Sequence, residues 1–145
     1  MNGDEKVTRA VVGEVARRTA RGAPVDEFAD LYADDVRFTG ADGTVIEGRE
    51  PLLDYLRREE AAFPVSRMDV QTIAVDGNTG VLAWTSTTRH DTDLTLPSGT
   101  VLPATGRDLT IEGLNVLRIV GGKVVESRRY YDRLGLLTQL GLLSA

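Results

Sequence analysis

A change in hydrophobic spacing near Pro64 is the feature that most constrains the fold of this chain. Before that point, apolar residues recur mainly at helical spacing, which predicts helices over Asp4–Arg21, Pro24–Ala33 and Arg49–Phe63. Two short strands, Val36–Thr39 and Thr44–Glu47, are predicted between the second and third helices.

After Pro64 the pattern becomes that of long strands. They are predicted over Met68–Val75, Thr79–His90, Leu109–Val120 and Lys123–Tyr131. The turn signals Asp76-Gly77-Asn78 and Gly121-Gly122 join these strands into two hairpins. Helices that precede a long antiparallel meander indicate an α+β fold. A strongly curved sheet around a long helix would leave a concave interior.

The remaining segments are a long connection and a short end. Asp91–Arg107 is rich in Thr, Pro and Gly, and a loop of this length is usually functional or mobile. The apolar segment Leu134–Leu143 predicts one or two helical turns. Because the sequence has no repeat, linker or low-complexity tract, residues 1–145 are expected to form one domain.

Composition removes several classes of function. The chain has no cysteine and one histidine, His90, so thiolate chemistry and multi-histidine metal sites are excluded and no metal is expected. A net charge of -5 argues against nucleic-acid or anionic-membrane partners. No apolar run is long enough to cross a membrane, and the polar start lacks a signal-peptide core, so we expect a cytoplasmic protein.

Several ordered motifs resemble those of one family. They are Phe63-Pro64, Arg89-His90, Pro103-Ala104-Thr105-Gly106-Arg107, the stretch from Leu117 to Glu126, Tyr131-Asp132 and Gln139-Leu140-Gly141. Together they resemble the SnoaL-like branch of the nuclear-transport-factor-two-like superfamily. The resemblance implies a conical barrel in which three N-terminal helices pack on a strongly curved, mainly antiparallel sheet. It also implies a deep, mostly apolar pocket for a small hydrophobic ligand, and a homodimer formed through the sheet.

The family includes polyketide cyclases, limonene-epoxide hydrolases, ketosteroid isomerases, cofactor-independent hydroxylases and binding proteins. In its aldol cyclases, a histidine and an aspartate on the last two strands carry the acid–base work. The resemblance places these positions on Asn115 and Arg129 here, so both residues are replaced. Arg129 cannot act as a carboxylate base. Asp132 is the nearest carboxylate in the sequence.

Four residues are the catalytic candidates, and each has a structural alternative. Asp132 could be a general base or the N-cap of the final helical segment. His90 could exchange protons at the pocket entrance or bond to a loop carbonyl. Asn115 and Arg129 could form a donor pair for a ligand oxygen. Alternatively, Asn115 bonds within the core and Arg129 pairs with Glu112 or Asp132.

A second group is expected to line the pocket as ligand contacts or as core: Trp84, Tyr131, Tyr32, Phe63 and Leu117. Trp84 shares a strand face with His90, and Leu117 shares one with Asn115. Glu59-Glu60, on the third helix, is predicted to belong to a solvated face.

These observations predict a cofactor-free acid–base enzyme of the cyclase, isomerase, dehydratase or hydrolase type, acting on a hydrophobic oxygenated small molecule such as a polyketide intermediate. The alternatives are a non-catalytic module of the same fold that binds a small molecule or a protein, and a cofactor-independent hydroxylase. Titratable groups that converge at the cavity floor would favour an enzyme, whereas an apolar floor with charges only at the rim would favour binding.

Overall fold

The computed structural model describes residues 3–142, and its helices and strands follow the α+β order predicted from the sequence. The helical segments are α1 (Gly3–Ala20), the 3-10 helix η1 (Val25–Leu31), α2 (Arg49–Ala62) and α3 (Arg133–Gln139). The strands are β1 (Tyr32–Thr39), β2 (Val45–Glu47), β3 (Val65–Asp76), β4 (Thr79–Arg89), β5 (Leu94–Thr95), β6 (Val101–Leu102), β7 (Asp108–Val120) and β8 (Lys123–Tyr131). None of the described helices is long and apolar enough to cross a membrane.

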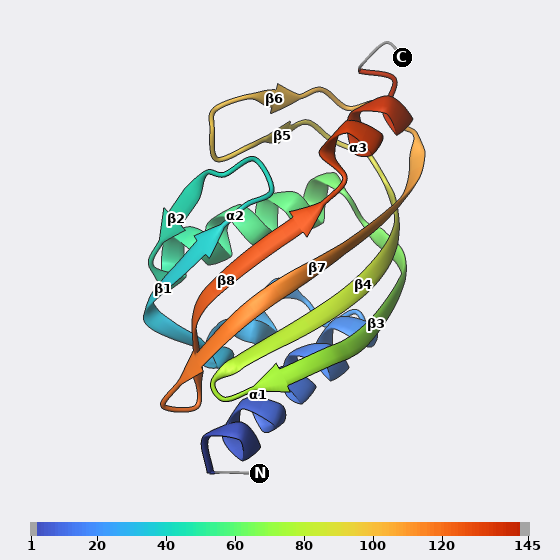
Figure 1. Cartoon of the computed structure of the whole chain (residues 1–145). Coiled ribbons are helices and arrows are strands. Elements are labelled where there is room, and N and C mark those ends of the chain that lie inside the picture. The colour runs from blue at the N-terminus through green and yellow to red at the C-terminus, as the bar shows by residue number, and fades with distance from the viewer. Residues whose placement is uncertain (1–2, 143–145) are drawn as a thin grey trace.

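Six strands form one curved sheet in the order β2-β1-β8-β7-β4-β3 (Figure 1). Every neighbouring pair is antiparallel except β1 and β8, which run parallel. The predicted α+β fold, with helices on a mainly antiparallel sheet, is confirmed. The sheet is open, because β2 and β3 are its two edges.

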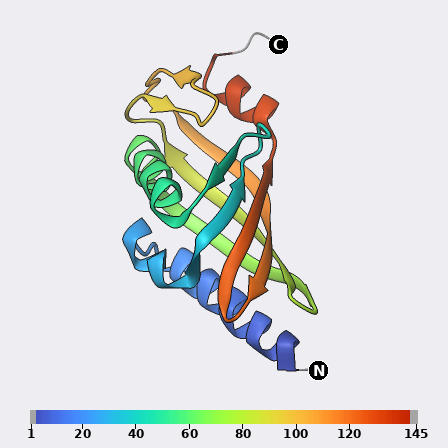
Figure 2. The ribbon, with the colours of Figure 1, turned by 90° about the vertical axis from the view of Figure 1, so that its left-hand side faces the viewer.

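The helices α1, η1 and α2 cover one face of the sheet (Figure 2). Helix α1 packs on β3 and β4, and α2 packs on β1. Gly80 allows the close approach of α1, since a Cβ there would clash with Cγ2 of Val12. The Thr8 hydroxyl also donates to the Gly77 carbonyl in the β3–β4 turn, 2.9 Å away. These contacts hold α1 against one end of the sheet.

The second predicted helix, Pro24–Ala33, is wrong in type and in its end. It is a seven-residue 3-10 helix that ends at Leu31, and strand β1 begins at Tyr32. Tyr32 pairs with Val124 of β8, a partner far along the chain. This pairing draws the chain into the sheet and ends the helical segment early.

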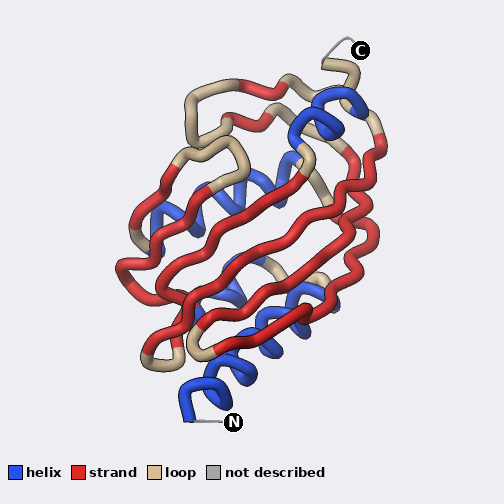
Figure 3. Tube along the Cα trace, viewed as in Figure 1, coloured by secondary structure: helices blue, strands red, loops and turns tan. Residues whose placement is uncertain are grey.

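The segment Asp91–Arg107, predicted as a loop, contains the two short strands β5 and β6 (Figure 3). Leu94 and Leu102 pair across this hairpin and are both buried. The Ala104 amide donates to Oδ1 of Asp93, 2.7 Å away, and ties the two ends of the hairpin together. The final helix α3 agrees with the predicted helical turns, although Leu143, the last residue of that prediction, lies outside the described residues.

Candidate functional site

A cavity of about 570 Å³ lies between the sheet and the helices that cover it. Apolar side chains from β3, β4, β7 and the β5–β6 hairpin line much of it, among them Val70, Leu82, Leu94, Leu102 and Leu117. Such a wall suits a small hydrophobic molecule, and a few polar groups would then orient that molecule.

An ion pair crosses this cavity from α2 to β8. Nη1 of Arg129 donates to both carboxylate oxygens of Glu59, at 2.8 and 2.7 Å. The two side chains are only 18% and 27% exposed. The Arg129 guanidinium also lies 5.1 Å from the centre of the Phe38 ring, a cation–π arrangement. Two groups of opposite charge therefore meet inside a largely apolar space.

Three tyrosines surround this ion pair and also line the cavity: Tyr32, Tyr55 and Tyr131. Burial raises the pKa of each phenol, and the Glu59 carboxylate raises it further, while Arg129 opposes the shift. Burial disfavours the charged form of Arg129, yet Glu59 together with Tyr55 and Tyr131 more than compensates and raises the guanidinium pKa. All four side chains are therefore protonated hydrogen-bond donors near neutral pH.

A hydrogen-bonded row crosses the sheet beside the ion pair. Nε1 of Trp84 donates to Oδ1 of Asn115, 2.8 Å away, and Nδ2 of Asn115 donates to the Ser127 hydroxyl, 3.2 Å away. Asn115 lies directly opposite Arg129 in the β7–β8 register. The structure thus places the proposed donor pair, Asn115 and Arg129, on adjacent strands of one cavity wall.

A register shift in β8 determines which residues of that strand face the cavity. Strict alternation would put Val125 on the same face as Ser127 and Arg129. The register changes between Arg118 and Ile119 of β7, and Val124 lies in the wall together with Ser127 and Arg129. Beyond this irregularity, the alternation expected from the sequence holds.

His90 is completely buried, but it is not among the residues that line the cavity. Its ring stacks on Phe63 with the ring centres 4.5 Å apart, and its Nδ1 lies 3.2 Å from the Thr105 hydroxyl. Burial lowers the imidazole pKa, although the backbone of Leu102 and Thr92 opposes the shift. Its Nε2 has no hydrogen-bond partner among the described residues. The structure thus places the His90 ring beside the Thr105 hydroxyl and outside the cavity.

Asp132 is exposed and does not line the cavity. Its Oδ1 accepts a hydrogen bond from the Gly135 amide, 2.8 Å away, so it caps the N-terminus of α3. The capping alternative is confirmed. The structure does not bring Asp132 and His90 together with Asn115 and Arg129.

The residues expected to contact a ligand all line the cavity: Trp84, Tyr131, Tyr32, Phe63 and Leu117. The predicted solvated face at Glu59-Glu60 is wrong for Glu59, which is the partner of Arg129 in place of Glu112 or Asp132. Glu59 follows Tyr55 by four residues, so both lie on the inward face of α2. The four-residue spacing from the apolar face of this helix is the sequence signal that indicates an inward-facing Glu59. Glu60 is exposed and accepts a bond from the Val25 amide.

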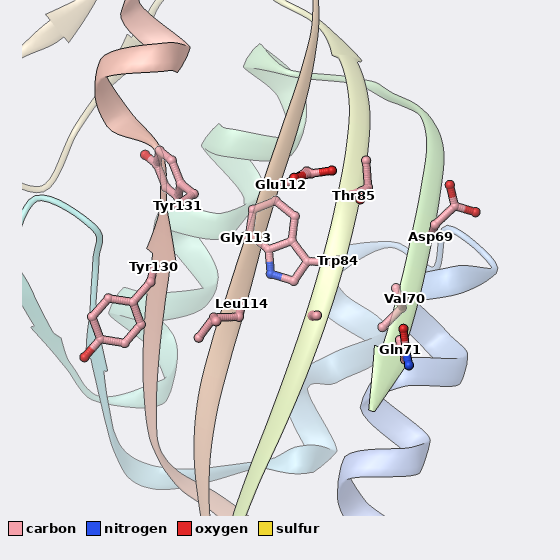
Figure 4. Close-up of a pocket in the computed structure, with 11 residues that line it drawn as sticks. Asp69, Val70, Gln71, Trp84, Thr85, Glu112, Gly113, Leu114, Tyr130 and Tyr131 are labelled. Atoms are coloured by element: carbon pink, nitrogen blue, oxygen red, sulfur yellow. The ribbon is translucent and has the colours of Figure 1, made fainter. Parts of the chain in front are cut away.

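A second, more open depression of about 710 Å³ lies on the other face of the sheet. Figure 4 shows its lining on β3, β4, β7 and β8, including Asp69, Thr85, Glu112 and Tyr130. Its carboxylates lie on β3 and β7, which β4 separates. Across residues 3–142, no three His, Asp or Glu side chains gather in a way that could hold a metal ion.

Comparison with known proteins is consistent with this architecture. Residues 12–127 match the sequence model of the SnoaL-like domain. A search of curated proteins finds no match.

Among solved structures, a protein named as a SnoaL-like polyketide cyclase from Jannaschia sp. CCS1 is 18% identical, with a TM-score of 0.80 over 99% of this chain and 98% of that one. TsrD from Streptomyces laurentii is 21% identical, with a TM-score of 0.72 over 98% of this chain and 100% of that one. A Mycobacterium tuberculosis protein described as a LEH-like epoxide hydrolase is 14% identical, with a TM-score of 0.63 over 93% of this chain and 90% of that one. At these identities the likeness shows the fold alone.

Proposed function

Because the chain belongs to the SnoaL-like domain family, we propose that it is a cofactor-free acid–base enzyme acting on a small hydrophobic molecule that carries a carbonyl group. The observation that carries this proposal is the Glu59–Arg129 ion pair inside the apolar cavity, surrounded by three protonated tyrosines. Titratable groups converge in the interior, and that arrangement favours catalysis over simple retention of a ligand.

In the proposed reaction, the Glu59 carboxylate accepts a proton from the carbon next to the ligand carbonyl. The electron pair of the broken C–H bond moves onto the carbonyl oxygen. Arg129, Asn115 and a tyrosine hydroxyl then stabilise the enolate through hydrogen bonds. Where the enolate is conjugated with a C=C bond, return of the proton from Glu59 to the far carbon gives an isomer. Attack of the enolate carbon on a second carbonyl instead closes a ring, and the alkoxide formed takes the proton from Glu59.

Asp132 and His90 have structural roles in this proposal. Asp132 is occupied as a helix cap, and His90 lies behind Phe63, outside the cavity lining. Neither residue is placed to exchange a proton with a ligand that contacts Arg129.

A ligand-binding protein without catalysis is the second candidate. Both Glu59 oxygens accept bonds from the same nitrogen, so the ion pair could be a purely structural bridge across the cavity. In that case the apolar wall would retain a ligand, and no proton would move.

The exchange of α-protons of 2-tetralone in D₂O, followed by ¹H NMR, tests the two candidates. Exchange in this ketone needs only removal of the α-proton by the base, replacement of that proton by a deuteron from the solvent, and return of the deuteron to the same carbon. We expect the protein to accelerate exchange and Glu59→Gln to slow it by about a hundredfold or more. The matched control is Glu112→Gln, the same change on the opposite face of the sheet. Equal rates for Glu59→Gln and the parent would refute the catalytic role, and binding without acceleration would favour the second candidate.

We also propose a homodimer that associates through the outer face of the sheet. Tyr130 is 49% exposed there and lies in the depression of Figure 4. Sedimentation equilibrium tests the proposal: the parent should sediment as a dimer and Tyr130→Glu as a monomer. A monomeric parent would contradict it.

A further inference from the structure

The orientation of the Asn115 amide is determined by its neighbour Trp84. Nε1 of Trp84 lies 2.8 Å from one terminal atom of the Asn115 side chain. An indole N–H is a donor only, so the atom that receives it must be the amide oxygen. The amide nitrogen therefore points the other way, toward the Ser127 hydroxyl.

The position of the indole depends in turn on Gly113. Trp84 and Gly113 are directly opposite each other on β4 and β7. A Cβ on Gly113 would lie 2.5 Å from Cζ2 and 2.7 Å from Cη2 of the indole. Only glycine leaves the ring room to lie across β7 toward Asn115, with its centre 6.5 Å from that of the Tyr131 ring. The glycine and the indole together form a fixed support for the amide.

The fixed amide has one donor left for a ligand. Nδ2 carries two hydrogens, and the only acceptor for them among residues 3–142 is Ser127. Asn115 lines the cavity directly opposite Arg129. An amide free to turn could exchange the places of its oxygen and its nitrogen, but the bond from Trp84 fixes the oxygen on the Trp84 side and the nitrogen with its unused N–H on the other.

We infer that Trp84 is a positioning residue that holds Asn115 as a hydrogen-bond donor, so that the cavity selects molecules with an acceptor oxygen, such as a ketone, over the same skeleton without one. The inference rests on the proposed function, since it takes the cavity as the ligand site. It adds the specificity of that site and assigns a role to Trp84. In this role Trp84 contacts Asn115, and Asn115 contacts the ligand oxygen.

The experiment compares 2-tetralone with tetralin, the same bicyclic skeleton without the oxygen. Dissociation constants are measured for both, and the ratio between them isolates recognition of the oxygen from the size of the cavity. Trp84 is the only tryptophan in the chain, so its indole N–H gives one resolvable ¹H–¹⁵N signal.

In Asn115→Asp, which removes the donor, the preference for the ketone should fall about tenfold, the usual effect of one lost hydrogen bond to a ligand. In Trp84→Phe, which frees the Asn115 amide to turn, the preference for the ketone should fall severalfold. Asn115→Leu provides a second variant that adds no charge, and its Trp84 signal should shift as the indole loses its acceptor. Asn78→Asp, the same chemical change in the β3–β4 turn, should leave the ratio unchanged.

A ratio that survives both Asn115→Asp and Trp84→Phe would overturn the inference, as would a parent protein that binds neither compound. The exchange assay with Glu59→Gln is independent of this ratio. If the ratio of dissociation constants is the same in the parent and in the Asn115 and Trp84 variants, but Glu59→Gln abolishes exchange, the proposed function is supported and the role of Trp84 is refuted. If the ratio falls in Asn115→Asp and Trp84→Phe but the parent catalyses no exchange, the protein is a binding protein in which Trp84 positions the hydrogen-bond donor.

Discussion

Both carboxylate oxygens of Glu59 on α2 accept hydrogen bonds from a single nitrogen, Nη1 of Arg129 on β8. This contact joins a helix to the last long strand across the cavity. It also leaves Nε and Nη2 of Arg129 without an acceptor among the described residues. The arginine can therefore hold its carboxylate partner and still offer hydrogen bonds to a ligand oxygen.

Arg129→Met should lower the free energy of unfolding by about 2 kcal/mol, because it leaves the largely buried Glu59 carboxylate without its partner of opposite charge. Urea unfolding measures the change. The matched control is Arg118→Met, since Arg118 pairs with Glu126 at 3.8 Å and is 49% exposed. That variant should change stability by less than about 0.5 kcal/mol. Similar losses in the two variants would contradict the prediction.

Gly113→Ala should destabilise the protein by about 2 kcal/mol, because the added Cβ meets both the indole of Trp84 and the Tyr130 carbonyl oxygen, 2.7 Å away. The fluorescence of Trp84 should change at the same time as the ring moves. Gly13→Ala, inside α1, is the comparison: its Cβ would meet only the end of Arg17 at 3.4 Å. Because alanine has a higher helix propensity than glycine, the free energy of unfolding of Gly13→Ala should rise by about 0.5–1 kcal/mol. Equal stability of the two variants would refute the crowding argument.

Asp132→Ala should lower stability by about 1 kcal/mol through loss of the α3 cap, while Asp132→Asn, which can still accept the Gly135 N–H, should lower it much less. Both variants should exchange the protons of 2-tetralone within about twofold of the parent rate. A rate that collapses in Asp132→Asn, with the fold intact, would instead restore Asp132 as the base.

The buried imidazole of His90 should make stability depend on pH. Burial lowers its pKa below the value of about 6.5 that it has in an unfolded chain. The unfolded state therefore binds the proton first, so the contribution of His90 is fully present above about pH 6.5 and is lost as the pH falls below that value. The negative charges of Asp93 and Asp91 oppose the pKa shift.

Urea midpoints at pH 7.5 and 5.5 measure this effect. The parent should lose more stability between the two values than His90→Gln, which cannot titrate. A parallel decline in both proteins would assign the pH dependence to other groups.

The sequence carried enough information for the long strands but less for the site. Strand β8 was predicted with its observed ends, Lys123 and Tyr131, because strong turn residues precede it and alternating side chains fill it. The second helix was misjudged because its end depends on Tyr32 pairing with Val124, which local propensity cannot show.

Asn115 and Arg129 could be placed on one wall because strand alternation and hairpin register are local rules. Glu59 could not be placed by the same means. Its helix carries charges on several sides, and only the docking of α2 against the sheet turns Glu59 toward Arg129. The cap formed by Asp132 is a local contact with Gly135, three residues further on, so the sequence could offer it as an alternative. The position of His90 depends instead on tertiary contacts with Phe63 and Thr105.

The parallel pairing of β1 with β8 has a consequence for synthesis of the chain. Residues of β1 leave the ribosome before β3, β4 and β7, but among the described strands β1 pairs only with the short β2 and with β8, which is made after all of these. Until β8 emerges, one side of β1 has no neighbour, and apolar residues such as Phe38 have no finished core to enter. Closure of the cavity is therefore expected to be among the last events of folding, after the hairpins of the meander have formed locally.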